Sequence, residues 1–458
     1  MRRKPAVSAA PTTATPDLGP AVALSCRECG EQYPLGPLYA CLECFGPLEV
    51  AYDLAGVTRA SIEAGPRNLW RYKQLLPVPT TVEQTRNTEP GLTPLRRADN
   101  LAKALGMRRL WVKDDTANPT HSFKDRVVAV ALAAARELGF GVLACPSTGN
   151  LANAVAAAAA RAGIRSVVLV PADLEQQKIL ATAVYGGMLL AVEGTYDDVN
   201  RLASEIAEEH DDWAFVNVNV RPFYAEGSKT LGYEVAEQLG WRLPEQVVIP
   251  VASGAQLTKV DKAFSELVGL GLVASRVVAS ESGISAQTRA AAAKELEDLT
   301  GDGRPTQRAE HGVRVYGAQA SGCAPVAAAY KAGHDVVRPV RPDTIAKSLA
   351  IGNPADGPYV LDVCRRTAGA VEDVSDAEVV EGIRLLASTE GVFPETAGGV
   401  TVAVLRKLLS TGQLDPEAET VVFNTGDGLK TVDAVAETAR PDAVIKPTLD
   451  AFRSVVDL

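Results

Sequence analysis

One stretch of the chain decides its fold: Asn118-Pro119-Thr120-His121-Ser122-Phe123-Lys124-Asp125-Arg126. It places a lysine between a proline-containing approach and a long apolar helix, which we predict over residues 127–138. A lysine at a helix start is unfavourable, because the helix dipole favours anions there. A lysine removed from water can instead form a Schiff base with an aldehyde cofactor. The alternative is a solvated first turn, in which Lys124 has no chemical role.

A second motif, Ser147-Thr148-Gly149-Asn150, follows about one βα unit later. It ends a short apolar run at residues 142–145 and opens an alanine-rich helix. Backbone N–H groups and hydroxyls at a helix N-terminus bind anions well. An ordinary helix cap would use the same residue types, so this motif alone leaves both interpretations open.

Short apolar runs alternate with helical patterns beyond residue 110, which predicts βαβ units and a mostly parallel sheet with helices on both faces. We expect a polar surface loop over residues 302–311. The strands are predicted at 142–145, 165–170, 188–192, 214–218, 246–251 and 420–423. The helices, besides 127–138, are predicted at 196–210, 228–239 and 397–409.

Two more polar turns follow predicted strands, where ligands bind in such folds. The turn Ala252-Ser253-Gly254-Ala255-Gln256 offers small residues and a helix start, which suit a phosphate. The turn that begins Asn424-Thr425-Gly426 could place the Thr425 hydroxyl against a ring nitrogen. Each could equally be a tight turn without a ligand. Together with Lys124, the three turns suit one phosphorylated, ring-shaped aldehyde, and pyridoxal phosphate fits that description.

Composition and charge narrow the possible partners. The chain has 458 residues, of which 47% are hydrophobic, and a net charge of −10. This charge argues against nucleic acid and anionic membranes as main partners. No apolar run is long enough for a membrane span. The first 20 residues lack an apolar core, so we expect a disordered tail rather than a signal peptide, and a cytoplasmic protein.

Four of the seven cysteines form two Cys-x2-Cys pairs separated by 11 residues: Cys26, Cys29, Cys41 and Cys44. Two such pairs joined by a short hairpin are typical of a zinc ribbon, in which four thiolates hold one tetrahedral ion. Two disulfides of a secreted domain are the alternative. A zinc ion here would be structural, because four thiolates leave no open position. The remaining cysteines are expected to be buried: Cys145, Cys323 and Cys364.

The chain resembles the threonine synthases, members of the fold-type II class of pyridoxal-phosphate enzymes, from about residue 24 to residue 440. The resemblance rests on five strings in this order and spacing: the Lys124 string at 118–126, Ser147-Thr148-Gly149-Asn150, Glu226-Gly227-Ser228-Lys229-Thr230, Glu395-Thr396-Ala397-Gly398-Gly399 and Asn424-Thr425-Gly426-Asp427-Gly428-Leu429-Lys430. It implies that Lys124 attaches the cofactor, with Phe123 beside the ring. It further implies that Asn150 bonds the ring hydroxyl and Thr425 the ring nitrogen.

The resemblance also implies a domain organisation and a homodimer. We expect a tail at residues 1–20, a zinc-ribbon-like module at 21–52 and a catalytic region at 53–445. Within the catalytic region, the smaller lobe is expected at about 126–240. The larger lobe is expected at about 53–125 together with 241–445.

The reaction that the resemblance implies is conversion of O-phosphohomoserine and water to L-threonine and phosphate, by γ-elimination and β-addition. Ser147, Thr148 and Gly149 should then hold the substrate carboxylate. Three candidates for the leaving phosphate are Asn219, Arg221 and Lys178. The phosphate turn and Pro394 depart from the family pattern. These departures leave open a replacement or elimination on another phosphorylated or activated amino acid. The alternative outside enzymes is a zinc-ribbon protein with a degenerate, regulatory ligand fold, which would require a lost lysine, whereas Lys124 is present.

Overall fold

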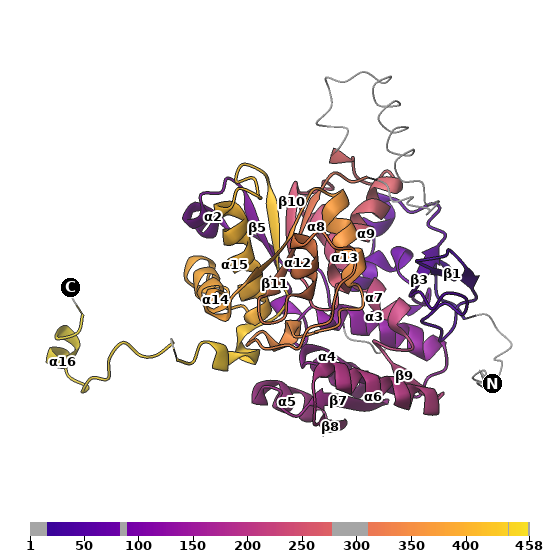
Figure 1. The fold of residues 1–458 in the computed structure, drawn as a ribbon, viewed down its shortest axis with the longest axis horizontal. Coiled ribbons are helices and arrows are strands. Elements are labelled where there is room, and N and C mark those ends of the chain that lie inside the picture. The colour runs from indigo at the N-terminus through magenta and orange to yellow at the C-terminus, as the bar shows by residue number, and fades with distance from the viewer. Residues whose placement is uncertain (1–15, 83–88, 277–309, 438, 457–458) are drawn as a thin grey trace, which may run out of the picture.

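The computed structural model describes residues 16–82, 89–276, 310–437 and 439–456 (Figure 1). Its strands form three sheets. A small antiparallel sheet near the N-terminus has the order β2-β1-β3, built from β1 (Ala21–Cys26), β2 (Gln32–Tyr33) and β3 (Leu48–Tyr52). The other two sheets belong to two α/β lobes. The predicted class, two lobes with a separate N-terminal module, is therefore confirmed.

The larger sheet has the strand order β12-β11-β10-β13-β5-β4. All neighbouring strands are parallel except the edge strand β4, which runs antiparallel to β5. Its interior strands are buried apolar runs, as expected for a parallel sheet covered on both faces. The strands are β4 (Leu95–Arg97), β5 (Leu110–Asp114), β10 (Gln246–Pro250), β11 (Arg314–Ala320), β12 (Val371–Val374) and β13 (Thr420–Asn424).

The smaller sheet is wholly parallel, with the strand order β8-β7-β6-β9. Its strands follow one another within a single stretch of the chain, unlike those of the larger sheet. They are β6 (Val142–Pro146), β7 (Arg165–Pro171), β8 (Met188–Val192) and β9 (Trp213–Phe215).

Helices cover both faces of each parallel sheet (Figure 1). The principal helices are α2 (Asp99–Leu105), α3 (Lys124–Glu137), α4 (Asn150–Ala162), α5 (Gln176–Ala183), α6 (Tyr196–Glu209), α7 (Arg221–Glu226), α8 (Lys229–Gln238), α9 (Ala255–Gly269), α12 (Pro325–Lys331), α13 (Gly357–Arg366), α14 (Asp376–Glu390) and α15 (Thr396–Ser410). Val247 and Ile249 of β10 join one hydrophobic core with α8, α9 and α13. Val248 points to the opposite face and joins a second core with α2, α14 and α15.

The helix that begins at Lys124 lies between the two lobes. Ala129 and Val130 of α3 belong to the hydrophobic core of the larger lobe, whereas Val128 and Leu132 belong to the core of the smaller lobe. Eleven residues of this helix are buried. Because α3 is packed on opposite sides, its N-terminal lysine is held in a fixed place relative to both lobes.

The N-terminal sheet docks on the catalytic region through buried charged groups. Glu49 of β3 pairs with Lys259 at 2.5 Å and with Lys262 at 3.2 Å, both on α9. The Tyr52 hydroxyl donates to Glu226 at 2.7 Å. These contacts join the module firmly to α7 and α9.

The structure reproduces most predicted elements within one or two residues, with some differences. Helix α3 begins at Lys124, not at residue 127, and β9 ends at Phe215, so the strand predicted over 214–218 was too long. Residues 216–220 form a turn instead. Most of the predicted loop at 302–311, and residues 1–15 of the predicted tail, lie outside the described residues. Within the loop range, His311 is buried and bonds Asp261 at 2.9 Å.

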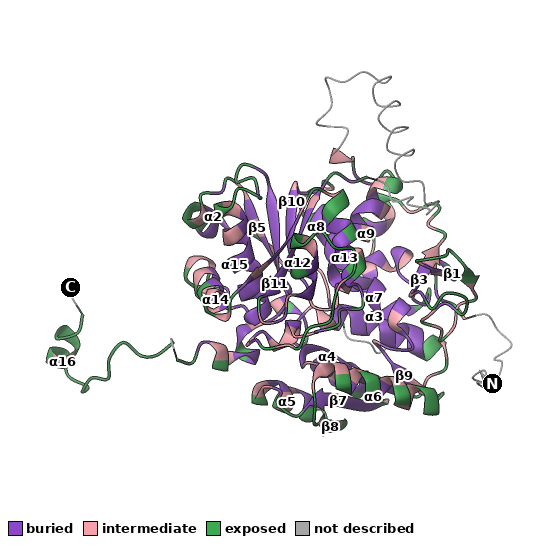
Figure 2. Cartoon of the chain, viewed as in Figure 1, coloured by how far each residue is buried: buried purple, intermediate pink, exposed green. Residues whose placement is uncertain are grey.

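Residues inside the two lobes are mostly buried, and residues at the edges of the lobes are mostly exposed (Figure 2). The strands of the larger sheet are mostly buried, whereas the edge strand β8 is largely exposed. The last described helix, α16 (Leu449–Arg453), lies away from the two lobes and is exposed (Figures 1 and 2). Across the four described ranges, no helix has both the length and the apolar character needed to cross a membrane.

Candidate active site

A cavity of about 270 Å³ lies between the two lobes. It is lined by Lys124 and by the turns that follow β6, β10 and β13. The carboxyl ends of strands from both parallel sheets therefore meet at one place. The lining includes Phe123, Lys124, Ser147, Thr148, Asn150, Arg221, Tyr224, Ser253, Gly254, Ala255, Gln256, Glu395 and Thr425.

Lys124 faces this cavity from the first position of α3. Its Nζ donates to the Tyr224 hydroxyl at 3.1 Å and lies 4.6 Å from the centre of the Phe123 ring. The surrounding protein removes the amine from water, which lowers the pKa of Lys124 to about 8, although the Glu395 carboxylate acts in the opposite direction. A lysine with such a pKa is partly uncharged near neutral pH and can act as a nucleophile or a base.

The backbone before Lys124 is tied to the turn after β13. The Phe123 N–H donates to the Thr425 carbonyl at 3.0 Å, and Ser122 pairs with Gly426 in an antiparallel bridge. Thr425 is buried and lines the cavity. The segment that leads into Lys124 and the turn that carries Thr425 are thus held in register by main-chain hydrogen bonds.

The turn after β6 is shaped by a serine and a glycine. The Ser147 Oγ accepts from the N–H groups of Gly149 and Ala152, both at 2.9 Å. Gly149 has a φ of +119°, and a Cβ on it would lie 2.2 Å from the Lys178 Cδ. Only glycine fits there, so the turn brings bare backbone up to the cavity at the start of α4.

The Asn150 side chain bonds two buried charged groups of the site, Glu395 and Lys430. Its Nδ2 donates to both carboxylate oxygens of Glu395, each at 2.8 Å, and its Oδ1 accepts from the Lys430 Nζ at 3.0 Å. Burial lowers the pKa of Lys430 to about 8, against the attraction of Glu395 and Asp125. Lys430 and Glu395 fix which side of the amide faces each neighbour. The two oxygens belong to one carboxylate, so one N–H shared between them would leave the second N–H of the Nδ2 for a ligand.

The turn after β10 forms the N-terminus of α9. Gly254 has a φ of +96°, and a Cβ on it would lie 2.7 Å from Val360 and 2.9 Å from Asp356. The Gln256 side chain is buried, and its Nε2 has no hydrogen-bond partner among the described residues. A buried donor without a partner costs about 1–3 kcal/mol, so this one suits an acceptor brought by a ligand. The turn and the free donor together fit a phosphate.

Of the three residues predicted to hold a leaving phosphate, one lines the cavity and two lie outside its lining. Arg221 lines the cavity, and its Nη2 donates to Asp356 at 2.6 Å. Asn219 is outside the lining: it accepts from the Phe215 N–H and donates to the Trp213 carbonyl, both at 2.9 Å, and so stabilises the turn after β9. Lys178 is also outside it, fully buried beneath Gly149 and paired with Glu175 at 3.2 Å.

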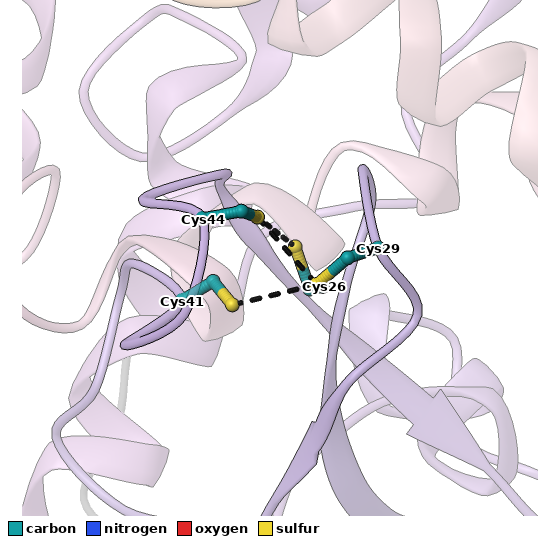
Figure 3. Close-up of side chains that lie close together, drawn as sticks. All are labelled: Cys26, Cys29, Cys41 and Cys44. Atoms are coloured by element: carbon teal, nitrogen blue, oxygen red, sulfur yellow. Dashed lines mark hydrogen bonds between the residues drawn. The ribbon is translucent and has the colours of Figure 1, made fainter.

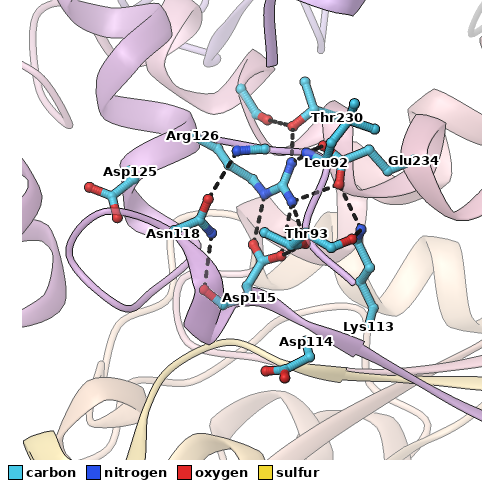
Figure 4. Close-up of polar contacts among 12 residues, drawn as sticks. Leu92, Thr93, Lys113, Asp114, Asp115, Asn118, Asp125, Arg126, Thr230 and Glu234 are labelled. Carbon is cyan, nitrogen blue, oxygen red and sulfur yellow. Dashed lines mark hydrogen bonds and ion pairs between the residues drawn. The ribbon is translucent and has the colours of Figure 1, made fainter. Parts of the chain in front are cut away.

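Arg126, two residues after Lys124, is fully buried in a network of charges (Figure 4). Its guanidinium donates to Asp115 at 2.7 and 2.9 Å and to both oxygens of Glu234. Lys113 adds a second cation, 2.6 Å from Glu234. Burial raises the pKa of Glu234, but Arg126 and Lys113 outweigh it and lower the pKa to about 2. The network ties α3 to α8 and β5.

The four N-terminal cysteines gather at one point (Figure 3). Their sulfur atoms all lie within 4.8 Å of one another, with separations of 3.4 Å for Cys26 and Cys44 and 3.6 Å for Cys29 and Cys41. A tetrahedral ion with Zn–S bonds of about 2.3 Å would hold sulfurs about 3.8 Å apart. The four thiols are free, so the alternative of two disulfides does not describe this structure.

The sequence predicted Lys124, Asn150, Thr425 and the turns at 147–149 and 253–256 as site residues. It did not predict the side chains that hydrogen-bond to them. Glu395 and Lys430 lie in strings that carried the resemblance, yet they had no assigned role. Tyr224, which contacts Lys124, was not among the predicted site residues. Its signal was weak, because nothing in the sequence brings residue 224 to residue 124. A periodic pattern shows which residues are buried, but not which buried polar groups meet.

Comparison with known proteins adds to this geometry. The model of the pyridoxal-phosphate dependent enzyme family matches residues 87–309 and 290–426. A threonine synthase of Methanocaldococcus jannaschii is 33% identical over 437 residues, covering 94% of this chain and 98% of that protein. One of Methanosarcina acetivorans is 32% identical over 441 residues, with the same coverage.

Solved structures match the fold at lower identity. The diaminopropionate ammonia lyase of Escherichia coli has a TM-score of 0.59 and 18% identity, and the match covers 91% of this chain and 97% of that one. The threonine deaminase isoform 2 of Solanum lycopersicum has a TM-score of 0.56 and 21% identity, covering 76% and 83%. At these identities the likeness concerns the fold alone.

Proposed function

Because this chain belongs to the pyridoxal-phosphate-dependent enzymes, and within them to the threonine synthases, we propose that it converts O-phosphohomoserine and water to L-threonine and phosphate. The single observation that carries the proposal is the Lys124 amine. It lies in a cavity between two anion-binding turns, with its pKa lowered to about 8.

The residues present fit pyridoxal phosphate. The turn at 253–256 and the unpartnered Gln256 Nε2 would receive its phosphate, the second hydrogen of the Asn150 Nδ2 its ring hydroxyl, and Thr425 its ring nitrogen. Phe123 would lie beside the ring. When bound, the cofactor withdraws electrons from the carbon next to the substrate nitrogen. A hydroxyl at the ring nitrogen does not enforce its protonation, unlike a carboxylate.

With the cofactor bound, Lys124 would hold its aldehyde until the substrate amine takes that place, and would then move protons. A Cβ proton is lost as the Cγ–O bond to phosphate breaks, and water later adds its hydroxyl at Cβ while a proton returns to Cα. Lys124 would take the first proton from Cα as a free amine and give a proton to Cγ as an ammonium. Both steps need an amine that titrates near neutral pH, and burial provides it. The Tyr224 hydroxyl, kept neutral because burial raises its pKa, accepts from the Nζ and orients it.

The substrate has two anionic ends, and we assign each to a different part of the cavity. The backbone N–H groups and hydroxyls at Ser147, Thr148 and Gly149 hold the carboxylate, next to Asn150 and the reacting carbon. Arg221 holds the leaving phosphate, since it is the one of the three sequence candidates that lines the cavity. Asn219 and Lys178 support the turns instead.

The test is incubation of the purified protein with O-phosphohomoserine while threonine and phosphate are measured. Equal amounts of the two products are expected. Release of phosphate without threonine, or activity confined to another phosphorylated or activated amino acid, would favour the alternative of a related replacement or elimination. A protein that binds the cofactor but turns over none of these substrates would contradict the proposal.

The two anion sites can be separated by substitution. Thr148→Ala should raise the KM for substrate roughly fivefold to tenfold with little loss of cofactor, because one hydrogen bond is worth about 1 kcal/mol. Gly254→Val should weaken cofactor binding by about 10- to 100-fold, through contact with Val360 and a strained positive φ. Cofactor absorbance and KM measure the two effects.

Gly163→Val is the matched control for the glycine substitution. Gly163 also has a positive φ, +68°, but a Cβ there meets nothing within 4 Å. It should therefore keep the cofactor. If Gly254→Val retains full cofactor while Thr148→Ala loses it, the two sites are assigned the wrong way round.

We also propose that Cys26, Cys29, Cys41 and Cys44 bind one structural zinc ion, with four thiolates and no open position. Elemental analysis should find one zinc per chain in protein purified without chelator. Because thiolate ligation couples metal to local folding, chelation should unfold the N-terminal module and leave cofactor absorbance mostly intact. Cys29→Ser should lose the metal, whereas Cys323→Ala should keep it. Metal-free protein from a chelator-free preparation would contradict the assignment.

The remaining expectations belong with the proposed function. The resemblance supports a homodimer in the cytoplasm, acting on a small phosphorylated amino acid rather than on nucleic acid or a membrane. Sedimentation at several concentrations would test the dimer.

A further inference from the structure

A buried carboxylate lies between an arginine of the cysteine module and the arginine of the cavity. One oxygen of Asp356 accepts from the Arg27 Nη1 at 3.2 Å, and the other accepts from the Arg221 Nη2 at 2.6 Å. The Asp356 side chain is only 6% exposed, and those of Arg27 and Arg221 are 11% and 25% exposed. The three groups therefore form a chain from the N-terminal module to the cavity.

The cysteine module holds both the backbone and the side chain of Arg27 in place. Arg27 follows Cys26 in the first Cys-x2-Cys pair, and its N–H donates to the Pro47 carbonyl at 3.1 Å. The guanidinium carbon lies 3.5 Å from the centre of the Tyr359 ring, and the Tyr359 hydroxyl donates to Glu28. Arg27 and Glu28, which lie between the two cysteines of the first pair, thus both contact Tyr359 at the start of α13, three residues after Asp356.

Asp356 also touches the turn that we assign to the cofactor phosphate. Its N–H donates to the Ser253 carbonyl at 2.8 Å, and its Cβ would lie 2.9 Å from a side chain on Gly254. Its side-chain carboxylate, in contrast, bonds only the two arginines among the described hydrogen bonds. The backbone of Asp356 supports the turn, and its charge acts on Arg221.

The charges of the three groups sum to one positive charge. Without Arg27, Asp356 would neutralise Arg221, and the cavity would lose its attraction for a phosphate dianion. Two further carboxylates lie near Arg27 among the described residues: Glu49, whose oxygen is 3.9 Å away and which already pairs with Lys259 and Lys262, and Glu28, which accepts from the Tyr359 hydroxyl. Charges held in a partly buried cleft act more strongly on a ligand than exposed ones.

We propose that Arg27 is a positioning residue for substrate specificity: it engages Asp356 so that Arg221 keeps a net positive charge for the leaving phosphate. The inference rests on the proposed function, because it takes Arg221 as the group that receives that phosphate. It gives the cysteine module a part in recognising the phosphorylated substrate, through an arginine that never reaches the cavity.

The test is a charge-rescue experiment on the full-length, cofactor-loaded protein. Arg27→Met should raise the KM for O-phosphohomoserine, and weaken competitive inhibition by inorganic phosphate, each by about tenfold, with kcat changed less than twofold. Arg27→Lys keeps the charge and should lie near the wild type. In the double variant Arg27→Met, Asp356→Asn, the three positions again carry one positive charge, that of Arg221. The KM for O-phosphohomoserine and the inhibition constant of phosphate should then both return to within about threefold of wild type.

Arg97→Met is the matched control. Arg97 also lies over an aromatic ring, that of Trp111 at 5.3 Å, and pairs with an aspartate, Asp99 at 2.8 Å, but none of these residues lines the cavity. It should leave both constants unchanged. Zinc content and cofactor absorbance, measured for every variant, report whether the module and the phosphate turn stay folded.

The possible results show whether the role of Arg27 or the proposed function is wrong. A double variant no better than Arg27→Met, or Arg27→Met with an unchanged KM, would overturn the charge account. A purely structural role for Arg27 predicts the first of these results, with loss of zinc. If the wild type makes no threonine, the proposed function fails instead. Calorimetric binding of inorganic phosphate to the same variants would then still decide whether the three charges act together.

Discussion

Replacing Lys124 with alanine should abolish covalent attachment of the cofactor and reduce turnover by about 10³-fold or more. Lys124 is the one lysine among the residues that line the described cavity; Lys430 and Lys178 lie behind Asn150 and Gly149. No other amine can therefore take its place. Mass spectrometry after borohydride reduction measures the attachment, and threonine formation measures the turnover.

Lys124→Arg is the sharper variant, because it keeps the positive charge. A guanidinium does not lose its proton at neutral pH, so it can neither attach the aldehyde nor act as a base. It should fail as completely as alanine while the fold and the docking of α3 are retained. Turnover within tenfold of wild type in Lys124→Ala would contradict the assignment of this residue.

Replacing Arg126 with methionine should destabilise the protein by about 3–5 kcal/mol, because it leaves buried carboxylates with too few cations. Asp115 loses both bonds that the guanidinium donates, and Glu234 keeps only Lys113 among the cations (Figure 4). The urea midpoint of unfolding measures the loss. Arg201→Met, which removes an exposed helix pair with Glu205, is the control and should change stability by about 0.5 kcal/mol or less.

The same network predicts a pH dependence. The folded protein lowers the pKa of Glu234 from its ordinary value of 4.5 to about 2. The stability that this provides is present above pH 4.5 and is lost as the pH falls from 4.5 towards 2. The stability difference between wild type and Arg126→Met should therefore narrow in acid. A constant difference across this range, or a loss below about 1 kcal/mol at neutral pH, would show that the network contributes little.

Strands were the most predictable part of the fold, because a parallel sheet with both faces covered needs continuous apolar runs. The strand predicted over 214–218 shows the limit of this reasoning. Its alternating Val-Asn pattern reads as a strand, but the Asn219 side chain bonds the backbone at both ends of β9 and closes a turn. A side chain that competes for backbone hydrogen bonds is invisible to a hydrophobic pattern.

The site was predictable as a set of turns and not as a set of contacts. The rule that ligands bind at strand ends predicted that the turns of Asn150 and Thr425 lie together, and the structure places both residues on one cavity with Lys124. It could not show that Asn150 meets Glu395, which is 245 positions further along the chain, or Lys430 beyond it. Nor could it show that Lys178 supports Gly149 from below. The two pairings of Asn150 depend on how the lobes close on each other, and that of Lys178 depends on how α5 packs beneath the turn within the smaller lobe.

The position of β13 has a consequence for how the chain is made. The smaller sheet uses only residues 142–215 and can form while the ribosome is still synthesising the rest. The larger sheet must wait, because β13 at residues 420–424 lies between β10 and β5 and is its last strand to emerge. Until then both neighbours expose unpaired edges, which invite aggregation. Nascent chains stalled just before residue 420 should hold a protease-resistant smaller lobe and bind chaperones through the larger one.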